Sequence, residues 1–170
     1  AILLGMLSAY AGADQSGESW SRLYRRMPDI KQKYSIIQNI APLDDRTLEP
    51  FLLSSLNHLV YGDLAAYRTD RAAYDDWEIL TRALVHELGD IKAQSAGAVI
   101  WDVVRSAETP LLKAEGLIAL GMIRASEYAP EIALILRNLN FNTRTDRDNA
   151  EIEAYGAVIS LEKLKDKAGF

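Results

Sequence analysis

The most regular feature of the sequence is an apolar triplet at positions i, i+3 and i+6, with a small residue directly after its middle member. This spacing places the three side chains on one face of a helix. The small position recurs at residues 5, 41, 89, 121 and 162, at intervals of 32 to 48 residues, although residue 162 is a glutamate. Self-similarity at such a period is typical of stacked helical repeats. The pattern therefore predicts an all-α fold.

Two stretches, 81–104 and 113–136, match each other best. Their common motif reads LGDIKA at 88–93 and LGMIRA at 120–125. A glycine near the end of an apolar run marks either the C-terminus of a helix or a close approach between two helices. A shift of 80 residues places Pro50 on Pro130, and each proline is expected in the first turn of its helix.

These motifs resemble those of the HEAT/armadillo-like repeat proteins, in which each repeat is a pair of antiparallel helices. The resemblance covers nearly the whole chain and implies an α-α superhelix, a right-handed solenoid of about four and a half helix pairs. The second helix of each pair would line the inner surface. The sequence departs from the family pattern at Glu162 and in an incomplete set of Arg and Asp positions. The expected segments are a truncated repeat at 1–9 and repeats at 18–43, 45–91, 94–123 and 126–165.

Apolar periodicity and capping residues predict the individual helices. Thr109-Pro110 is a strong start, with an N-cap followed by proline at the first helical position. Asp44 or Asp45 caps the helix that contains Pro50. Asp75 and Glu78 have capping-box spacing and open another helix. We expect long polar loops at 61–76 and 140–149, and helices at 19–27, 29–41, 50–60, 75–88, 94–106, 110–121, 126–138 and 149–165.

The first 13 residues, AILLGMLSAYAGA, could be read as the core of a signal peptide. Their match to the repeat register favours a helix of a truncated repeat instead. The chain lacks an initiator Met and starts inside this repeat, so we expect a fragment of a longer solenoid. A first helix without its neighbour would favour self-association of the isolated protein. No segment approaches the roughly 20 apolar residues of a membrane span.

Composition and charge narrow the classes of partner. The apolar content of 49% and the charged content of 25% are ordinary for a soluble protein. The net charge of −5 disfavours nucleic acid and anionic membranes. Because the chain has no cysteine, disulfides, zinc–thiolate sites and cysteine nucleophiles are excluded. The compartment stays open between the cytoplasm and an extracytoplasmic space such as the periplasm.

The string RTDR occurs twice, at 68–71 and at 144–147. Both copies lie between the first and second helices of their expected repeats, so both should emerge on one edge of the solenoid. Loops on a rigid scaffold often carry binding residues. Under the simpler interpretation, Asp or Thr caps the next helix and the arginines pair with acidic neighbours. The three tryptophans are expected to fill the core, and Trp77, at a helix start beside the first loop, is the one that is also a candidate for a partly exposed anchor. The candidate partner-binding residues are Arg68, Asp70, Arg71, Trp77, Arg144, Asp146 and Arg147.

Two further clusters are candidate sites. Arg22, Arg25 and Arg26 form a basic patch that could contact phosphate or an acidic peptide, although such residues are more often solvated or paired. His86-Glu87 resembles the start of a zinc-peptidase HExxH motif, with Asp90 at the second ligand position. A structural role for this histidine is favoured, so we expect no metal and no cofactor. The sequence contains no nucleophile elbow and no phosphate-binding loop.

The sequence favours a non-catalytic scaffold that binds a protein or peptide partner on its concave face or along the loop edge. Two alternatives stay open. The first is an enzyme on a HEAT-like scaffold, similar to the alkylpurine DNA glycosylases, although such an enzyme needs a strongly basic concave face. The second is a structural spacer within a longer chain.

Overall fold

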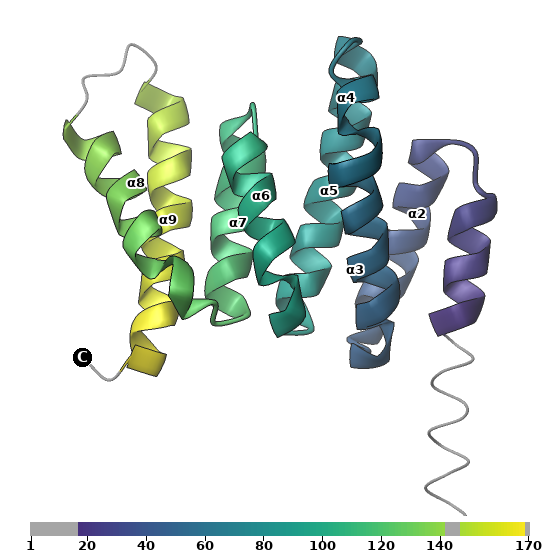
Figure 1. Ribbon diagram of the computed structural model, residues 1–170, viewed down its shortest axis with the longest axis horizontal. Coiled ribbons are helices and arrows are strands. Elements are labelled where there is room, and N and C mark those ends of the chain that lie inside the picture. Colours follow the sequence, from purple (N-terminus) through teal and green to yellow (C-terminus); the bar gives the residue numbers. More distant parts are fainter. Residues whose placement is uncertain (1–16, 142–146, 169–170) are drawn as a thin grey trace, which may run out of the picture.

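The computed structural model describes residues 17–141 and 147–168, and within these ranges every regular element is a helix (Figure 1). The predicted all-α class is therefore confirmed. Five elements form the first half: a helix over 17–26, α2 (Ile30–Ile40), α3 (Glu49–Asn57), α4 (Leu64–Tyr67) and α5 (Arg71–Asp90). The second half consists of α6 (Gly97–Ser106), α7 (Pro110–Met122), α8 (Ala129–Phe141) and α9 (Arg147–Ala168).

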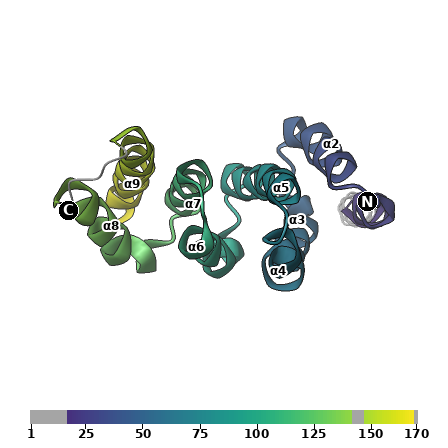
Figure 2. The same cartoon turned by 90° about the horizontal axis from the view of Figure 1, so that it is seen from above.

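The helices lie in two rows, which the view from above separates (Figure 2). One row, here called the second-helix layer, contains α2, α5, α7 and α9. The other contains the helix over 17–26, α3 with α4, α6 and α8. Within the second-helix layer α5 packs between α2 and α7, and α7 packs between α5 and α9. Each expected repeat segment from residue 18 onward holds one helix or helical run from each row, whereas the segment 1–9 lies outside the described residues.

Side-chain caps explain where three of the helices begin. Asp29 accepts a hydrogen bond from the backbone N–H of Lys31 at the start of α2. Asp70 accepts from two backbone N–H groups at the start of α5, and Thr109 accepts one at the start of α7. These caps satisfy N–H groups that have no partner within the helix. The predicted start at Thr109-Pro110 is confirmed. Of the alternatives Asp44 and Asp45, Asp45 is the cap, on the short turn before α3.

The two LG motifs end α5 and α7 in the same way. At each end, the residue three positions after the glycine adopts a left-handed conformation, with φ of 58° at Lys92 and 60° at Arg124. The next backbone N–H then bonds back to the leucine of the motif, from Ala93 to Leu88 and from Ala125 to Leu120. This is the Schellman arrangement, in which glycine usually occupies the left-handed position. Here the glycine lies inside the helix and serves another purpose.

Small residues let neighbouring helices of the second-helix layer approach closely. A Cβ added at Gly121 would lie 2.7 Å from the Cα of Ser160, and one at Gly156 would lie 2.6 Å from the Cα of Ala114. Both distances are shorter than any normal van der Waals contact, so only glycine fits at this crossing of α7 and α9. Of the two sequence interpretations of the LG glycines, the close approach of helices explains Gly121.

The predicted loop over 61–76 is wrong. A π-helix, His58–Asp63, continues α3 into α4, and α5 already begins at Arg71. A turn at 68–70 is all that separates the two helical runs. The capping box proposed for Asp75 and Glu78 is consequently wrong as well, because both residues lie inside α5. Within the described ranges, no helix combines the length and apolarity needed to cross a lipid bilayer.

Candidate functional site

A hollow of about 240 Å³ opens on the second-helix layer between α2 and α5. Its wall combines apolar and ionisable side chains, and one of them, Glu115, comes from α7. Side chains of α2 and α5 line the two sides of the hollow. Next to it, α5 packs against α7. The residues that matter most for its chemistry are Tyr34, Ile79, Arg82, His86, Glu87 and Glu115.

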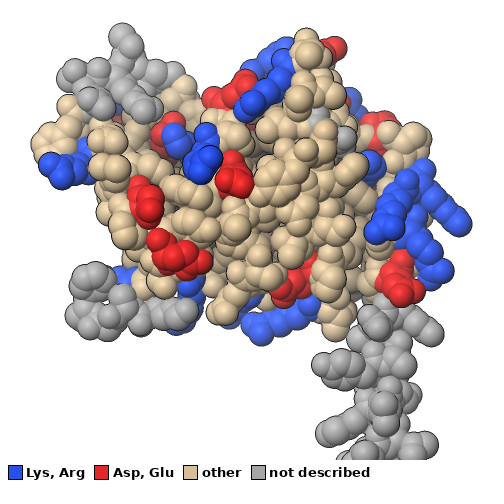
Figure 3. Space-filling view, viewed as in Figure 1, with Lys and Arg blue, Asp and Glu red and all other residues tan. Residues whose placement is uncertain are grey.

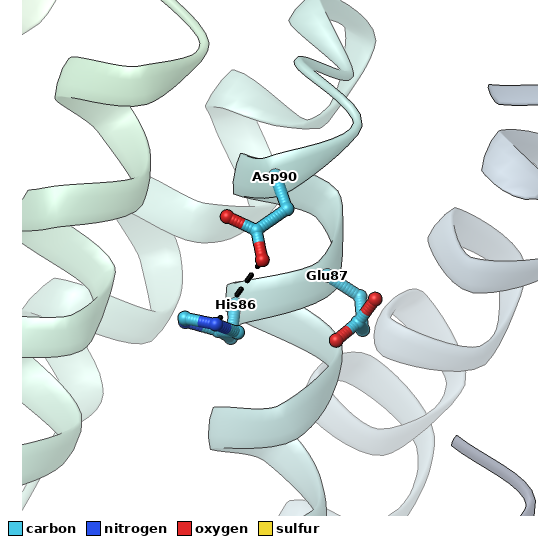
Figure 4. Close-up of side chains that lie close together, drawn as sticks. All are labelled: His86, Glu87 and Asp90. Atoms are coloured by element: carbon cyan, nitrogen blue, oxygen red, sulfur yellow. Dashed lines mark ion pairs between the residues drawn. The ribbon is translucent and has the colours of Figure 1, made fainter. Parts of the chain in front are cut away.

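His86 lies between two carboxylates at the edge of this hollow. Its Nδ1 is 2.7 Å from Oε1 of Glu115 on α7, and its Nε2 is 3.1 Å from Oδ2 of Asp90, one helical turn further along α5. Figure 4 shows the ring of His86 and the Asp90 carboxylate on the same side of the helix, with Glu87 on the other side. The sequence drew attention to His86, Glu87 and Asp90, but gave no sign that Glu115 would join them.

The surroundings shift the pKa values of two members of this group. Burial lowers the pKa of His86, but the hydrogen bond to Glu115 and the charge of Asp90 outweigh it, so the pKa lies above its ordinary 6.5. Burial, followed by the charge of Asp90, raises the pKa of Glu87 above its ordinary 4.5. Asp90 contributes to both shifts, because its negative charge favours the protonated form of each neighbouring group.

The first RTDR string forms a turn that is fastened to its surroundings. Asp70 caps α5, while Arg71 pairs with Asp75 at 3.0 Å. Arg68 reaches the α6–α7 connection, where it donates to the carbonyl of Ser106 and pairs with Glu108 at 3.1 Å. At this copy, the simpler interpretation of capping and pairing is therefore confirmed.

The second RTDR string is only partly described. Arg147 begins α9 and pairs with Glu151 at 2.9 Å, while Arg144 and Asp146 lie outside the described residues. Because α5 and α9 both begin at the upper edge in Figure 1, Arg71 and Arg147 share one edge of the molecule. A role for these residues in partner binding stays a prediction.

Trp77 is fully buried, so the prediction that it is a partly exposed anchor is wrong. Its indole N–H donates to the carbonyl of Leu59, and its ring packs against Tyr74 at a centroid distance of 5.3 Å. The error follows from the misplaced loop. With α5 beginning at Arg71, residue 77 lies two turns inside the helix, on the face that packs against α3 and its π-helical continuation.

The basic patch is exposed, as an amphipathic helix predicts. Arg22, Arg25 and Arg26 all lie on the exposed side of the helix over 17–26. Figure 3 shows basic side chains gathered at this end of the molecule, while the middle of the same face carries few charges. A role in contacting phosphate or an acidic peptide stays a prediction.

Sequence reasoning missed a set of exposed apolar side chains on the second-helix layer. Ile79 on α5 is 42% exposed, Leu111 on α7 is 52% exposed, and Tyr155 and Val158 on α9 are 63% and 48% exposed. Ile79 lies among polar residues on its side of α5, whereas Leu111 shares its side of α7 with Ile118 and Met122. Apolar spacing alone therefore did not separate these exposed positions from the core.

Comparison with known proteins adds no further constraint on the function. No protein-family model, no curated protein and no solved structure matches this chain. The functional conclusion therefore depends on the geometry of the second-helix layer.

Proposed function

We propose that this protein is a non-catalytic, HEAT-like interaction module that binds a partner protein through the exposed face of its second-helix layer. The observation that carries the proposal is the recurrence of exposed apolar side chains on three successive helices of this layer, α5, α7 and α9. Single exposed apolar residues are common on protein surfaces, but a series along one face is a feature of interaction sites.

The packing of the helices leaves one face of this layer available. α7 has α5 and α9 on its two sides and α6 behind it. α5 is enclosed in the same way by α2, α7 and α3. Leu111, which is exposed, and the half-buried Glu115 and Ile118 at helical spacing from it therefore lie on the remaining side of α7. A partner segment lying across α5, α7 and α9 would contact the apolar positions of all three.

The charges on this face suggest the chemistry of the partner. Asp90, Glu115 and Glu162 belong to the exposed or half-buried positions of α5, α7 and α9, and Arg82 is the basic residue at the hollow. We therefore infer a partner with apolar anchors flanked by lysine or arginine. An amphipathic helix with a basic polar face has this chemistry.

The HEAT-like architecture is part of the same proposal. It is supported by the matching Schellman ends of α5 and α7 and by the equivalent prolines at the starts of α3 and α8. It is also supported by the order of contacts, in which each helix of the second-helix layer packs on the next. Stacked helix pairs of this kind create extended surfaces for partner binding.

A matched pair of triple variants tests the proposed surface. Ile79→Ser, Leu111→Ser and Tyr155→Ser are combined in one protein. The control combines Tyr61→Ser, Leu134→Ser and Phe141→Ser, which remove exposed apolar side chains outside this face. Proteins retained from a lysate of the source cells by immobilised wild-type protein are then quantified for both variants by mass spectrometry, with thermal unfolding as a check on folding.

The expected result is a partner that is retained by the wild type and by the control variant but lost from the second-helix variant. Because a few central anchors carry most of the binding energy in an interface, the loss should be at least tenfold. If both variants lose the partner equally, or if only the control variant loses it, the partner does not bind specifically through the second-helix layer.

A further inference from the structure

The group formed by His86, Glu87 and Asp90 has an arrangement that the interaction surface does not require. One ligand atom from each of these residues lies within 4.8 Å of the other two. His86 and Asp90 are four residues apart on α5, so they project from the same side of the helix (Figure 4). Two potential ligands at this spacing can bind one ion from a single helix.

The ring of His86 faces more acceptors than a neutral imidazole can satisfy. Both of its nitrogens point at carboxylate oxygens, which accept hydrogen bonds and cannot donate them. A neutral ring carries one N–H, so when Nδ1 donates to Glu115, the lone pair of Nε2 faces Asp90 at 3.1 Å. A cation between Nε2 and the Asp90 oxygen would remove the repulsion between their lone pairs. A proton on Nε2 would have the same effect.

The distance between the two atoms suits a metal ion. Zinc binds imidazole nitrogen and carboxylate oxygen at about 2.0–2.2 Å, which allows two ligand atoms about 3 Å apart to share one ion. Glu115 then has the role that carboxylates commonly have around metal-binding histidines. It accepts the hydrogen bond of the nitrogen that does not bind the metal and so fixes the orientation of the ring.

Glu87 gives an independent indication of a cation. The residue is 8% exposed and lines the same hollow, and among the described residues its carboxylate has no hydrogen-bond or ion-pair partner. Partial burial of a carboxylate disfavours its charged form, and a nearby cation offsets that cost. A cation between α5 and the hollow would provide that partner after a shift of about 1 Å in the side chain, given metal–oxygen distances of about 2 Å.

The geometry points to a divalent transition-metal site of the zinc type, with His86 Nε2 and the Asp90 carboxylate as ligands. Glu87, which has a ligand atom within 4.8 Å of theirs, becomes a third ligand only after its side chain moves toward them. Glu115 orients the histidine, and water completes the coordination. The mixture of one imidazole with carboxylates favours Zn²⁺, Co²⁺ or Ni²⁺ over Mg²⁺ and Ca²⁺, which prefer an all-oxygen site. All of these ligands lie on α5, and the hydrogen bond between His86 and Glu115 connects the site to α7. The site does not depend on the proposed interaction function.

The test uses tag-free protein from which metals have been removed by chelation. Zn²⁺ and, separately, Mg²⁺ are titrated into the protein in a calorimeter at neutral pH, and Co²⁺ is titrated with its visible absorption as the readout. We expect one Zn²⁺ per chain and a Co²⁺ spectrum of a site with nitrogen and oxygen ligands. His86→Gln, which can still bond to Glu115, should abolish binding. Glu115→Gln should weaken it by about 10–100-fold, and Asp90→Asn, which removes a ligand, should weaken it by at least as much.

His58→Gln is the matched control, because it removes the other histidine of the chain, and far-ultraviolet circular dichroism checks that each variant is folded. The proposal is overturned if the wild type takes up no Zn²⁺, if His86→Gln binds as tightly as the wild type, or if the loss follows His58→Gln instead. Equal affinity for Mg²⁺ and Zn²⁺ would also overturn it, since it would indicate that carboxylates bind the ion without the histidine. Absence of Zn²⁺ binding would leave a proton on Nε2 as the partner of Asp90.

Discussion

Replacement of Gly121 by alanine should destabilise the protein, although the same change usually stabilises a helix. A new Cβ at this position would lie 2.7 Å from the Cα and 3.0 Å from the carbonyl oxygen of Ser160. Both are backbone atoms of α9, so no side-chain rotation can relieve the contact. Because carbon atoms pack at about 3.5–4.0 Å, α7 and α9 would have to separate locally by about 1 Å.

Two opposing effects determine the magnitude. Overpacking of this kind typically costs about 1–3 kcal/mol. The higher helix propensity of alanine stabilises the folded state by up to about 1 kcal/mol and so offsets part of this cost. We therefore expect Gly121→Ala to lower the free energy of unfolding by about 1–2 kcal/mol, which in a chain of this size lowers Tm by about 2–8 °C.

The assay is urea unfolding followed by circular dichroism, and Gly97→Ala is the matched control. An added Cβ at Gly97 would meet nothing nearer than 3.6 Å, so this variant should be as stable as the wild type or up to about 1 kcal/mol more stable. If Gly121→Ala is also neutral or stabilising, the close crossing of α7 and α9 does not exist as described.

Three further predictions concern single side chains. Lys92→Gly should stabilise the protein by about 1 kcal/mol in urea unfolding, because Lys92 adopts a left-handed conformation that is unfavourable for residues other than glycine, whereas Lys92→Ala should bring no gain. Thr109→Ala should cost about 2 kcal/mol in the same assay, since it removes the cap of α7 and the hydroxyl that donates to buried Glu78, and Thr109→Ser should retain most of the stability. The hydrogen bond from Tyr61 to Asp102, together with burial and the charge of Asp102, raises the pKa of Tyr61 from 10.0 to about 12. Because this raised pKa favours the neutral phenol, the stabilisation is complete below pH 10 and is lost as the pH rises through about 12. Asp102→Asn should therefore lower the highest phenol pKa in a spectroscopic titration. An unchanged highest pKa in this variant would contradict the assignment.

The sequence predicted those features of the fold that depend on local chemistry. The start of α7 at Thr109-Pro110 and the position of α2 follow from capping residues and apolar spacing, and both are confirmed. The helical stretch over residues 61–67 was missed because Gly62-Asp63 resembles a loop, and because a π-helix shifts the apolar positions out of the usual 3.6-residue period. Leu64 and Tyr67, which pack against the core, were the signal that could have identified it.

The candidate site was less accessible to sequence reasoning. His86 and Asp90 could be paired because they lie four residues apart in one helix. Glu115 is 29 positions away from His86, and its contact depends on how α5 and α7 pack. The exposure expected for Trp77 followed from a misplaced boundary, because the residue lies inside α5 and not at its start.

Site-specific photocross-linking in the source cells tests the proposed interaction surface most directly. A photoreactive phenylalanine analogue replaces Leu111 or Tyr155 on the second-helix layer, or replaces Leu134 or Phe141 on α8 as controls. The account predicts the same partner protein in adducts from both second-helix positions, with neither α8 position giving that adduct. Adducts with that partner from α8 alone, or no adduct from any second-helix position, would contradict the account.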